Sequence, residues 1–147
     1  MGIQENKQAV MEGYRRFQSG DIRKLLDLYH DDAEWIGPEL AFVPFSGAFH
    51  GKTGIAQFFA KLDEAVHADR FEPAEFIADG DKVVVTGFAS WLAKPTGRRY
   101  DSDWVHVFTL RDGKVSRFEA YYDTAATEKA FRPEQTSQAS AAAQLHH

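Results

Sequence analysis

The chain has 147 residues, which is enough for one domain with a buried core. A net charge of −5 argues against general binding to nucleic acid or to an anionic membrane, and the lack of cysteine excludes disulfides and thiol catalysis. Aromatic residues reach 14%, which favours a cavity or an apolar interface.

No targeting or membrane-spanning segment is expected. The N-terminal segment has no basic region followed by an apolar run, so a signal peptide is not predicted. No stretch approaches the ~20 apolar residues that a membrane span needs. Together with the absence of cysteine, these features predict a cytoplasmic protein.

Two helices are predicted before the first strand. Residues 4–18 show an apolar stripe at helical spacing. A second helix should begin after Asp21, whose carboxylate can cap it, and should carry Tyr29 on its inner side. The acidic pair Asp31 and Asp32 is then interpreted as a structural pair at the end of this helix.

The next segment contains a short strand, a long apolar loop and a third helix. Residues 33–36 are compatible with a strand, and the third helix is expected over residues 53–66 with Thr53 as its cap. The loop over residues 39–51 is too apolar to be exposed at little cost, so we expect it to cover the mouth of a pocket. Its aromatic side chains are Phe42, Phe45 and Phe49.

The second half of the chain changes to the periodicity of strands. Four strands joined by glycine-containing turns are predicted over residues 70–78, 82–92, 98–110 and 114–122. A short helix over residues 124–131, capped by Asp123, should follow them. The remaining residues, 133–147, lack an apolar pattern and are predicted to form a flexible tail.

Helices followed by an antiparallel meander define an α+β fold. We expect one domain over residues 1–132, in which three N-terminal helices pack on one face of a curved antiparallel sheet and a short helix ends the domain. The space between the helices and the sheet would form the pocket.

The predicted hairpin over residues 98–123 places one titratable imidazole in an aromatic row. Side chains alternate along a strand, so His106 shares its face with Trp104 and Phe108. A histidine can donate or accept a proton near neutral pH, so His106 is the candidate catalytic residue. The alternative is a packed histidine that bonds a backbone carbonyl.

The register of this hairpin decides the surroundings of His106. A three-residue loop with Gly113 as a bulge would align the aromatic rows of the two strands. A two-residue loop would instead place His106 beside Glu119. We prefer the first register because it brings the apolar side chains together.

Small residues are expected beside His106 and Trp104. These are Gly87 and Ala89 on the preceding strand and Ala120 on the following strand. Small neighbours around large rings leave room for a small molecule. An apolar setting disfavours the charged imidazole, so we predict a neutral His106 with a pKa below that of free histidine.

The opposite face of the same strands is part apolar and part charged. It carries Val105, Val107, Glu119 and Tyr121. A face of this mixed character suits a two-fold contact between copies of the chain. The sequence therefore predicts a homodimer through this face.

Four segments in order resemble NTF2-like proteins, most closely their SnoaL-like branch. They are QSGD at residues 18–21, YHDDA at 29–33, GKTGI at 51–55 and FTLRDGKV at 108–115. The branch includes ketosteroid isomerases, polyketide cyclases and limonene-type epoxide hydrolases. The resemblance spans residues 4–131 and implies a cone-shaped fold with a pocket.

When the family's catalytic positions are transferred to this sequence, most of them carry residues without a catalytic group. The isomerases' carboxylate base would fall at Gly37, their helix tyrosine at Gly13 and their second acid at His106. The carboxylates and arginine of the epoxide hydrolases and cyclases would fall at Gly87, Ala89 and Ala120. Of these positions, only His106 carries a group that can move a proton.

The resemblance and the aromatic pattern together give a set of candidate ligand-binding residues. Tyr14 could donate a hydrogen bond to a ligand oxygen or simply fill the core, and the large rings could bind a ring-shaped ligand or pack on one another. The set is Tyr14, Phe17, Trp35, Phe59, Trp91, Trp104, Phe108, Phe118 and Tyr122.

No metal site and no cofactor are predicted. Asp101 and Asp103 form a D-x-D pattern, but no histidine or third carboxylate lies near them in sequence. No glycine-rich phosphate loop or nucleophile–base motif occurs.

Three functions fit these observations. The first is a cofactor-independent isomerase, cyclase or lyase that acts on a small apolar carbonyl compound, with His106 moving a proton or stabilising an enolate. The second is a carrier or sensor that binds a small apolar ligand without turnover. The third is a structural or adaptor module whose cavity is filled by its own aromatic side chains.

Overall fold

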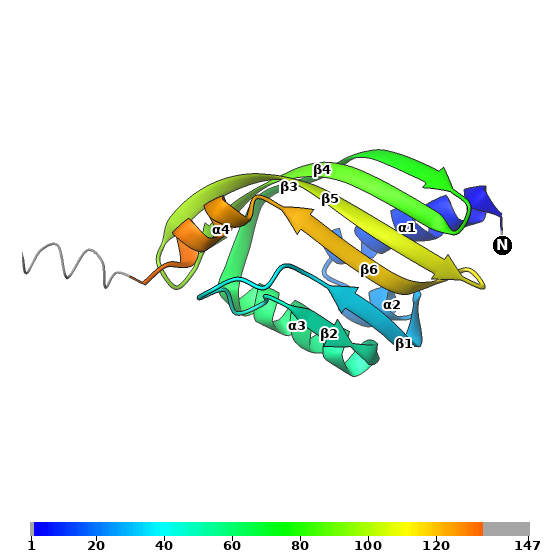
Figure 1. Cartoon of the computed structure of the whole chain (residues 1–147), viewed down its shortest axis with the longest axis horizontal. Coiled ribbons are helices and arrows are strands. Elements are labelled where there is room, and N and C mark those ends of the chain that lie inside the picture. Colours follow the sequence, from blue (N-terminus) through cyan, green and yellow to red (C-terminus); the bar gives the residue numbers. More distant parts are fainter. Residues whose placement is uncertain (1, 134–147) are drawn as a thin grey trace, which may run out of the picture.

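The computed structural model describes residues 2–133, in which helices cover one face of a curved six-stranded sheet (Figure 1). This arrangement confirms the predicted α+β class. In chain order the elements are α1 (Ile3–Gln18), α2 (Ile22–Leu26), β1 (Tyr29–Ile36), β2 (Ala48–His50), α3 (Gly51–Ala65), β3 (Val66–Asp79), β4 (Lys82–Ala93), β5 (Arg98–Arg111), β6 (Lys114–Tyr122) and α4 (Thr124–Phe131). The predicted tail lies outside the described residues except for its first residue.

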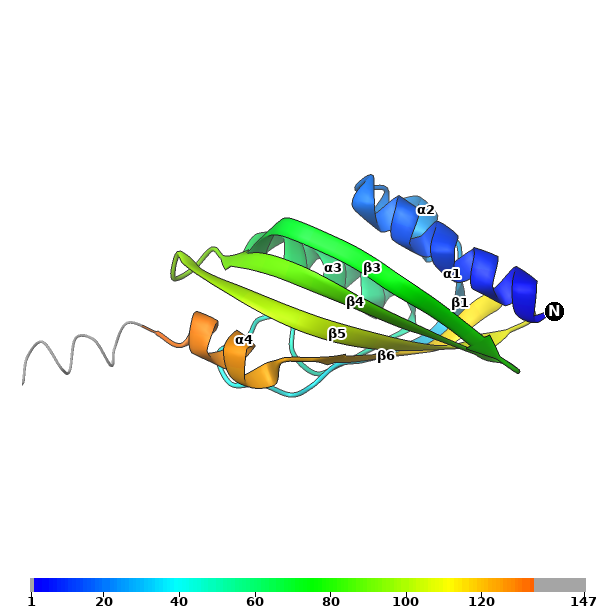
Figure 2. The same ribbon diagram turned by 90° about the horizontal axis from the view of Figure 1, so that it is seen from above.

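The helices α1, α2 and α3 lie on the same side of the sheet, and α4 lies beside its far end (Figures 1 and 2). As predicted, Asp21 caps α2, its carboxylate accepting a hydrogen bond of 3.1 Å from the Lys24 amide. Asp123 caps α4 in the same way, with a bond of 2.9 Å from the Ala126 amide. The cap predicted for α3 is wrong, because the helix begins at Gly51 and Thr53 lies in its first turn.

The second helix is shorter than predicted. It ends at Leu26, and Tyr29 already pairs with Val115 as the first residue of β1. Asp31 and Asp32 therefore lie on an exposed part of a strand and do not end a helix. Each forms an ion pair there, at 3.5 Å with Lys52 and at 3.3 Å with Arg111, respectively.

The sheet has the strand order β2-β1-β6-β5-β4-β3. The prediction of a wholly antiparallel sheet is wrong. The strand β1 runs parallel to β6, with Trp35 opposite Phe118. The short strand β2, which lies in the predicted loop, pairs antiparallel with β1. The β1–β6 contact joins the N-terminal part of the chain to the meander formed by β3 to β6.

The hairpin of β5 and β6 has the preferred register but a different turn. His106 lies opposite Ala120 and Phe108 opposite Phe118, so the aromatic rows align. Arg111 pairs with Lys114, which leaves a two-residue turn, and the register shift lies between Thr109 and Leu110 instead of at Gly113. The bulge within the strand thus achieves the alignment that we attributed to a longer loop.

The predicted pairing of β4 with β5 is wrong by two residues. Val85 lies opposite His106, and Gly87 lies opposite Trp104. Ala89 pairs with Ser102. The bare glycine therefore makes room for the indole of Trp104 and not for the imidazole.

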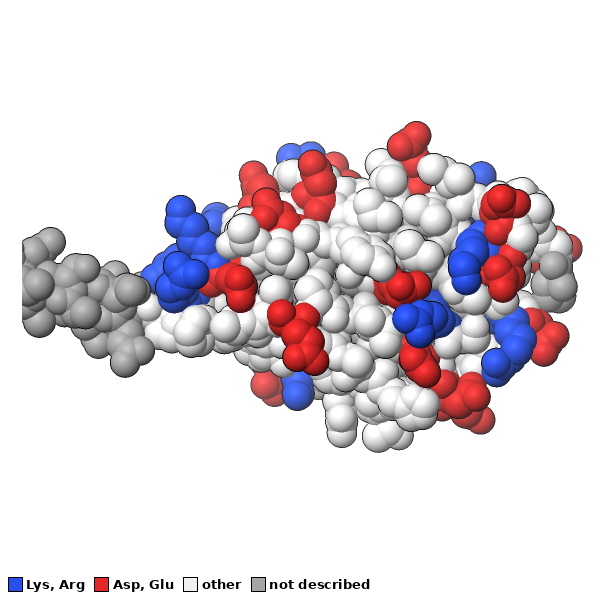
Figure 3. Space-filling model, in the orientation of Figure 1, with Lys and Arg blue, Asp and Glu red and all other residues white. Residues whose placement is uncertain are grey.

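The outer face of the sheet is the side seen in Figure 3, where a broad uncharged region lies between scattered charged side chains. Val105 and Val107 are half-buried there, and Tyr121 is 54% exposed. The Glu119 carboxylate on this face is already compensated by its neighbours. The Tyr121 hydroxyl donates to it at 3.0 Å, and Arg117 forms an ion pair with it at 3.4 Å. These observations support the proposal of a dimer through this face.

We predict that light scattering at micromolar concentration gives twice the monomer mass of 16.6 kDa. Val107→Glu should shift the mass toward the monomer, because it would bury a carboxylate at the contact. Ile3→Glu, at a residue on α1 that is 48% exposed, is the control and should stay dimeric. A monomeric wild-type protein would contradict the proposal.

Within residues 2–133, no helix combines the length and the apolar character needed to cross a membrane.

Candidate functional site

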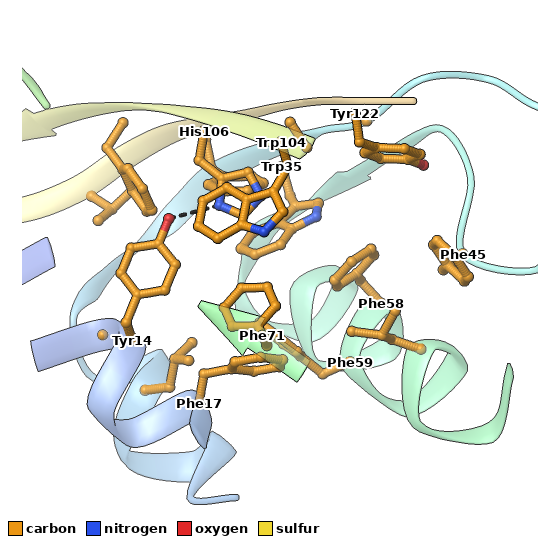
Figure 4. A pocket seen from close by; sticks show the side chains of 18 of the residues that line it. Tyr14, Phe17, Trp35, Phe45, Phe58, Phe59, Phe71, Trp104, His106 and Tyr122 are labelled. Atoms are coloured by element: carbon orange, nitrogen blue, oxygen red, sulfur yellow. Dashed lines mark hydrogen bonds between the residues drawn. The ribbon is translucent and has the colours of Figure 1, made fainter. Parts of the chain in front are cut away.

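A cavity of about 130 Å³ lies between the helices and the inner face of the sheet (Figure 4). Every residue that the sequence suggests as catalytic or ligand-binding borders it. These residues are His106, Tyr14, Phe17, Trp35, Phe59, Trp91, Trp104, Phe108, Phe118 and Tyr122. They come from α1, α3 and the strands β1, β4, β5 and β6.

His106 and Tyr14 form the polar centre of this cavity. The Tyr14 hydroxyl lies 2.6 Å from Nδ1 of His106, so a residue of α1 bonds a residue of β5 across the cavity (Figure 4). Around this pair the walls are aromatic, with the imidazole stacked on Trp104 at 4.1 Å and edge-on to Phe118 at 4.7 Å between centroids. The sequence identified both residues as site candidates but did not predict the hydrogen bond between them.

Burial determines the protonation of both partners. It lowers the pKa of His106 to about 3, in the direction expected from its apolar surroundings. Burial also raises the pKa of Tyr14 well above its ordinary value. Both groups are therefore neutral at pH 7.

The hydrogen bond selects one tautomer of the imidazole. The hydroxyl proton of Tyr14 has no other acceptor among the described residues, so the hydroxyl donates to Nδ1 of His106. The ring proton then resides on Nε2, for which no hydrogen bond is present among the described residues. His106 thus offers an N–H donor to whatever occupies the cavity.

Trp104 forms the wall beside His106. Its indole lies over Gly87, where a Cβ atom would come within 2.1 Å of a ring carbon. Phe71 from β3 stacks on the same indole at 4.9 Å with an interplanar angle of 12°. The glycine, the indole and the phenyl ring thereby define the shape of one side of the cavity.

The opposite wall is built around Trp35. Its ring stacks on Phe118 at 3.8 Å and contacts Phe58 at 4.7 Å and Phe59 at 5.1 Å, measured between centroids. Parallel pairing of β1 with β6 sets the first of these contacts, because it places Trp35 directly opposite Phe118.

No Asp, Glu, Lys or Arg side chain from the described residues borders the cavity. Asp101 and Asp103 are exposed, and the first accepts a hydrogen bond from Ser90 at 2.7 Å. Within residues 2–133, no three His, Asp or Glu side chains are placed to hold a metal ion. His106 is accordingly the one imidazole that borders the cavity in that range, and no carboxylate or basic side chain accompanies it there.

The loop between β1 and β2 contributes less to the cavity than predicted. Phe45 is buried and borders it. Phe42 is 57% exposed, with a φ of 68°, and Phe49 packs on Phe58 at 5.5 Å outside the cavity lining. Of these three phenylalanines, Phe45 borders the cavity, whereas the sequence predicted that all three would cover its mouth.

Sequence reasoning missed four rings that also border the cavity. They are Tyr29, Phe58, Phe71 and Tyr100. Register shifts on both sides of Phe71 interrupt the alternation of β3, so its inward direction could not be read from periodicity. Tyr100 lies opposite Trp91, so its inward direction could have been predicted from that pairing.

The comparisons agree with this architecture. The family described as "SnoaL-like domain" matches residues 10–118, and the chain therefore belongs to the SnoaL-like family of the NTF2-like superfamily. An NTF2-like protein from Burkholderia xenovorans LB400 is 36% identical and has a TM-score of 0.83, with 90% of this chain and 99% of that chain covered.

Two further solved structures are similar. TerC, co-crystallized with polyporic acid, is 34% identical with a TM-score of 0.79, and the match covers 88% of this chain and 99% of TerC. An NTF2-like protein of unknown function from Burkholderia pseudomallei K96243 is 27% identical with a TM-score of 0.81, covering 90% and 100% of the two chains.

Proposed function

We propose that this protein binds a small apolar ring compound with a carbonyl group and catalyses a cofactor-independent proton transfer of the isomerase or cyclase kind. The observation that carries the proposal is the hydrogen bond of 2.6 Å between Tyr14 and His106 inside an aromatic cavity. A cavity with one oriented polar pair is typical of a site that positions one polar atom of an apolar ligand.

The family and one relative support the choice of ligand and reaction. The NTF2-like fold is shared by isomerases and polyketide cyclases, which act on carbonyl compounds. TerC was co-crystallized with polyporic acid. The cavity of this chain offers a flat ligand aromatic faces on both walls.

His106 acts first as a hydrogen-bond donor. Its Nε2–H would bind the carbonyl oxygen, and Tyr14 would hold the ring in the required orientation. As the substrate loses its α-proton to solvent water, negative charge develops on that oxygen, and a positioned donor in an apolar cavity stabilises this charge strongly.

Direct proton transfer to His106 is costly while no anion is near. At pH 7 the medium is about four pH units above the pKa of about 3, so protonation of the imidazole costs roughly 5 kcal/mol. Both ring nitrogens are moreover engaged, Nδ1 by the Tyr14 hydroxyl and Nε2 by the ring proton, so the imidazole has no free lone pair for the α-proton. The α-proton therefore passes to solvent water, and His106 stays neutral and stabilises the enolate oxygen in our proposal.

The experiment measures exchange of the α-protons of cyclohexanone, a single-ring ketone, for deuterium by NMR. The wild-type protein should accelerate exchange, and His106→Gln should reduce the acceleration by about 10²-fold or more, a usual effect of losing a positioned donor to a developing oxyanion. Tyr14→Phe should lower it less, because it removes only the bond that orients the imidazole.

Tyr122→Phe is the matched control. Tyr122 also borders the cavity, but no contact with His106 is present, so the same chemical change should leave exchange close to wild type. The rate should also show no His106-dependent change between pH 5 and 8, because the pKa of about 3 lies below that range. Binding of cyclohexanone without acceleration would contradict catalysis and favour a carrier.

A further inference from the structure

A second hollow of about 540 Å³ lies behind the helix-side wall of the aromatic cavity. It is bordered by the C-terminal end of α1, by α3 and by the adjoining ends of β3 and β4. Exposed side chains on its rim, including Ala60, Asp63 and His67, open it to solvent. We call this hollow the outer groove.

The cavity and the outer groove share one wall. Four side chains border both, namely Phe17, Phe59, Leu62 and Trp91. Phe17 and Phe59 lie side by side on the helix side of the cavity, with ring centroids 5.9 Å apart (Figure 4). Because these side chains border both spaces, they form the partition between them.

The volumes decide what each space can hold. A cavity of about 150 Å³ accommodates benzene, so the 130 Å³ beside His106 has room for no more than a single ring. Ligand pockets in proteins commonly measure about 300–1,000 Å³. The cavity reaches that range only when it is joined to the 540 Å³ of the outer groove.

We propose that the two spaces form one bipartite site for a compound of two or more linked rings. The first ring lies beside His106, and the next passes between Phe59 and Trp91 into the outer groove. Rotation of these aromatic side chains opens the passage. This inference rests on the proposed function, since it assigns the remainder of the ligand that His106 holds.

The rim suits the outer end of such a ligand. Lys94 and Asp63 border the outer groove, and neither belongs to an ion pair within residues 2–133. The Lys94 ammonium is held there by a bond of 2.6 Å to the carbonyl oxygen of Asp63. A polar substituent on the second ring would therefore meet hydrogen-bonding groups and solvent, while the first ring lies beside His106 and Tyr14.

The test compares phenol with 4-phenylphenol by isothermal titration calorimetry. Phenol requires only the inner cavity, and 4-phenylphenol adds one ring. Burial of that ring should make 4-phenylphenol bind about tenfold more tightly or better. Ala60→Trp fills the outer groove from an exposed position that does not border the cavity. It should abolish the advantage of the second ring and leave phenol binding within about twofold.

Gln57→Trp is the matched control, because Gln57 is exposed on α3 and borders neither space. It should change neither affinity. Phenol binding with equal affinity for 4-phenylphenol, or an advantage that survives Ala60→Trp, would overturn the bipartite site and leave the proposed function standing. Failure of both compounds to bind would overturn the two proposals together.

Discussion

The imidazole of His106 should remain neutral from pH 8 down to about pH 4, and the stability of the protein should depend on that neutrality. The reason is burial in an apolar cavity, which lowers its pKa to about 3. In NMR spectra, the ring protons of His106 should show no titration through the range in which a free histidine, with a pKa near 6.5, gains its charge.

The consequence for stability has a definite sign. Between about pH 3 and pH 6.5, the unfolded chain binds a proton that the folded chain excludes. The free energy of unfolding should therefore rise with pH in this window, with a slope that approaches about 1.4 kcal/mol per pH unit. Across the window the contribution of His106 amounts to about 5 kcal/mol, all of it present above pH 6.5 and lost toward pH 3.

Urea unfolding of the wild-type protein and of His106→Gln at several pH values isolates this contribution. The variant loses the titrating ring, so its stability should fall less steeply on acidification. His67→Gln, at an exposed histidine on β3, is the control for loss of an imidazole from the surface. Parallel pH profiles for the wild type and His106→Gln would refute the assignment.

Gly87→Ala should destabilise the protein by about 3 kcal/mol, the upper part of the usual range for overpacked cores. The added Cβ would lie 2.1, 2.4 and 2.5 Å from three ring carbons of Trp104. The indole cannot retreat easily, because Phe71 stacks on it at 4.9 Å and His106 at 4.1 Å. Urea unfolding measures the loss, and near-UV circular dichroism should report displacement of the indole.

Gly13→Ala provides the comparison. Gly13 also borders the cavity, but a Cβ there would meet only a methyl group of Leu28 at 3.7 Å, which is ordinary contact. In the middle of α1, alanine should gain up to about 1 kcal/mol over glycine. A Gly87→Ala protein as stable as the wild type would contradict the packing of Trp104 described here.

The parts of this fold that follow local rules were predictable from the sequence. Alternation along β5 and β6 placed His106, Trp104 and Phe118 on the inner face, and the acidic caps marked the starts of two helices. These features depend on residues close together in the chain, where period and capping chemistry act directly.

The remaining features depend on long-range contacts and were missed for that reason. Tyr29 was assigned to a helix because nothing local shows that β6 will pair with it. The Tyr14–His106 bond joins residues 92 positions apart. The register between β4 and β5 differs by two residues from the predicted one. Side-chain direction was therefore predictable for the site, whereas the partner of each side chain was not.

The position of β6 has a consequence for how the chain assembles during synthesis. This strand lies between β1 and β5, although it is the last strand to leave the ribosome. Until it emerges, the segment from α1 to α3 has no strand through which to join the meander, and the facing edges of β1 and β5 stay unpaired. Such edges recruit other chains, so the nascent polypeptide should be most prone to aggregation, and most dependent on chaperones, just before residues 114–122 appear.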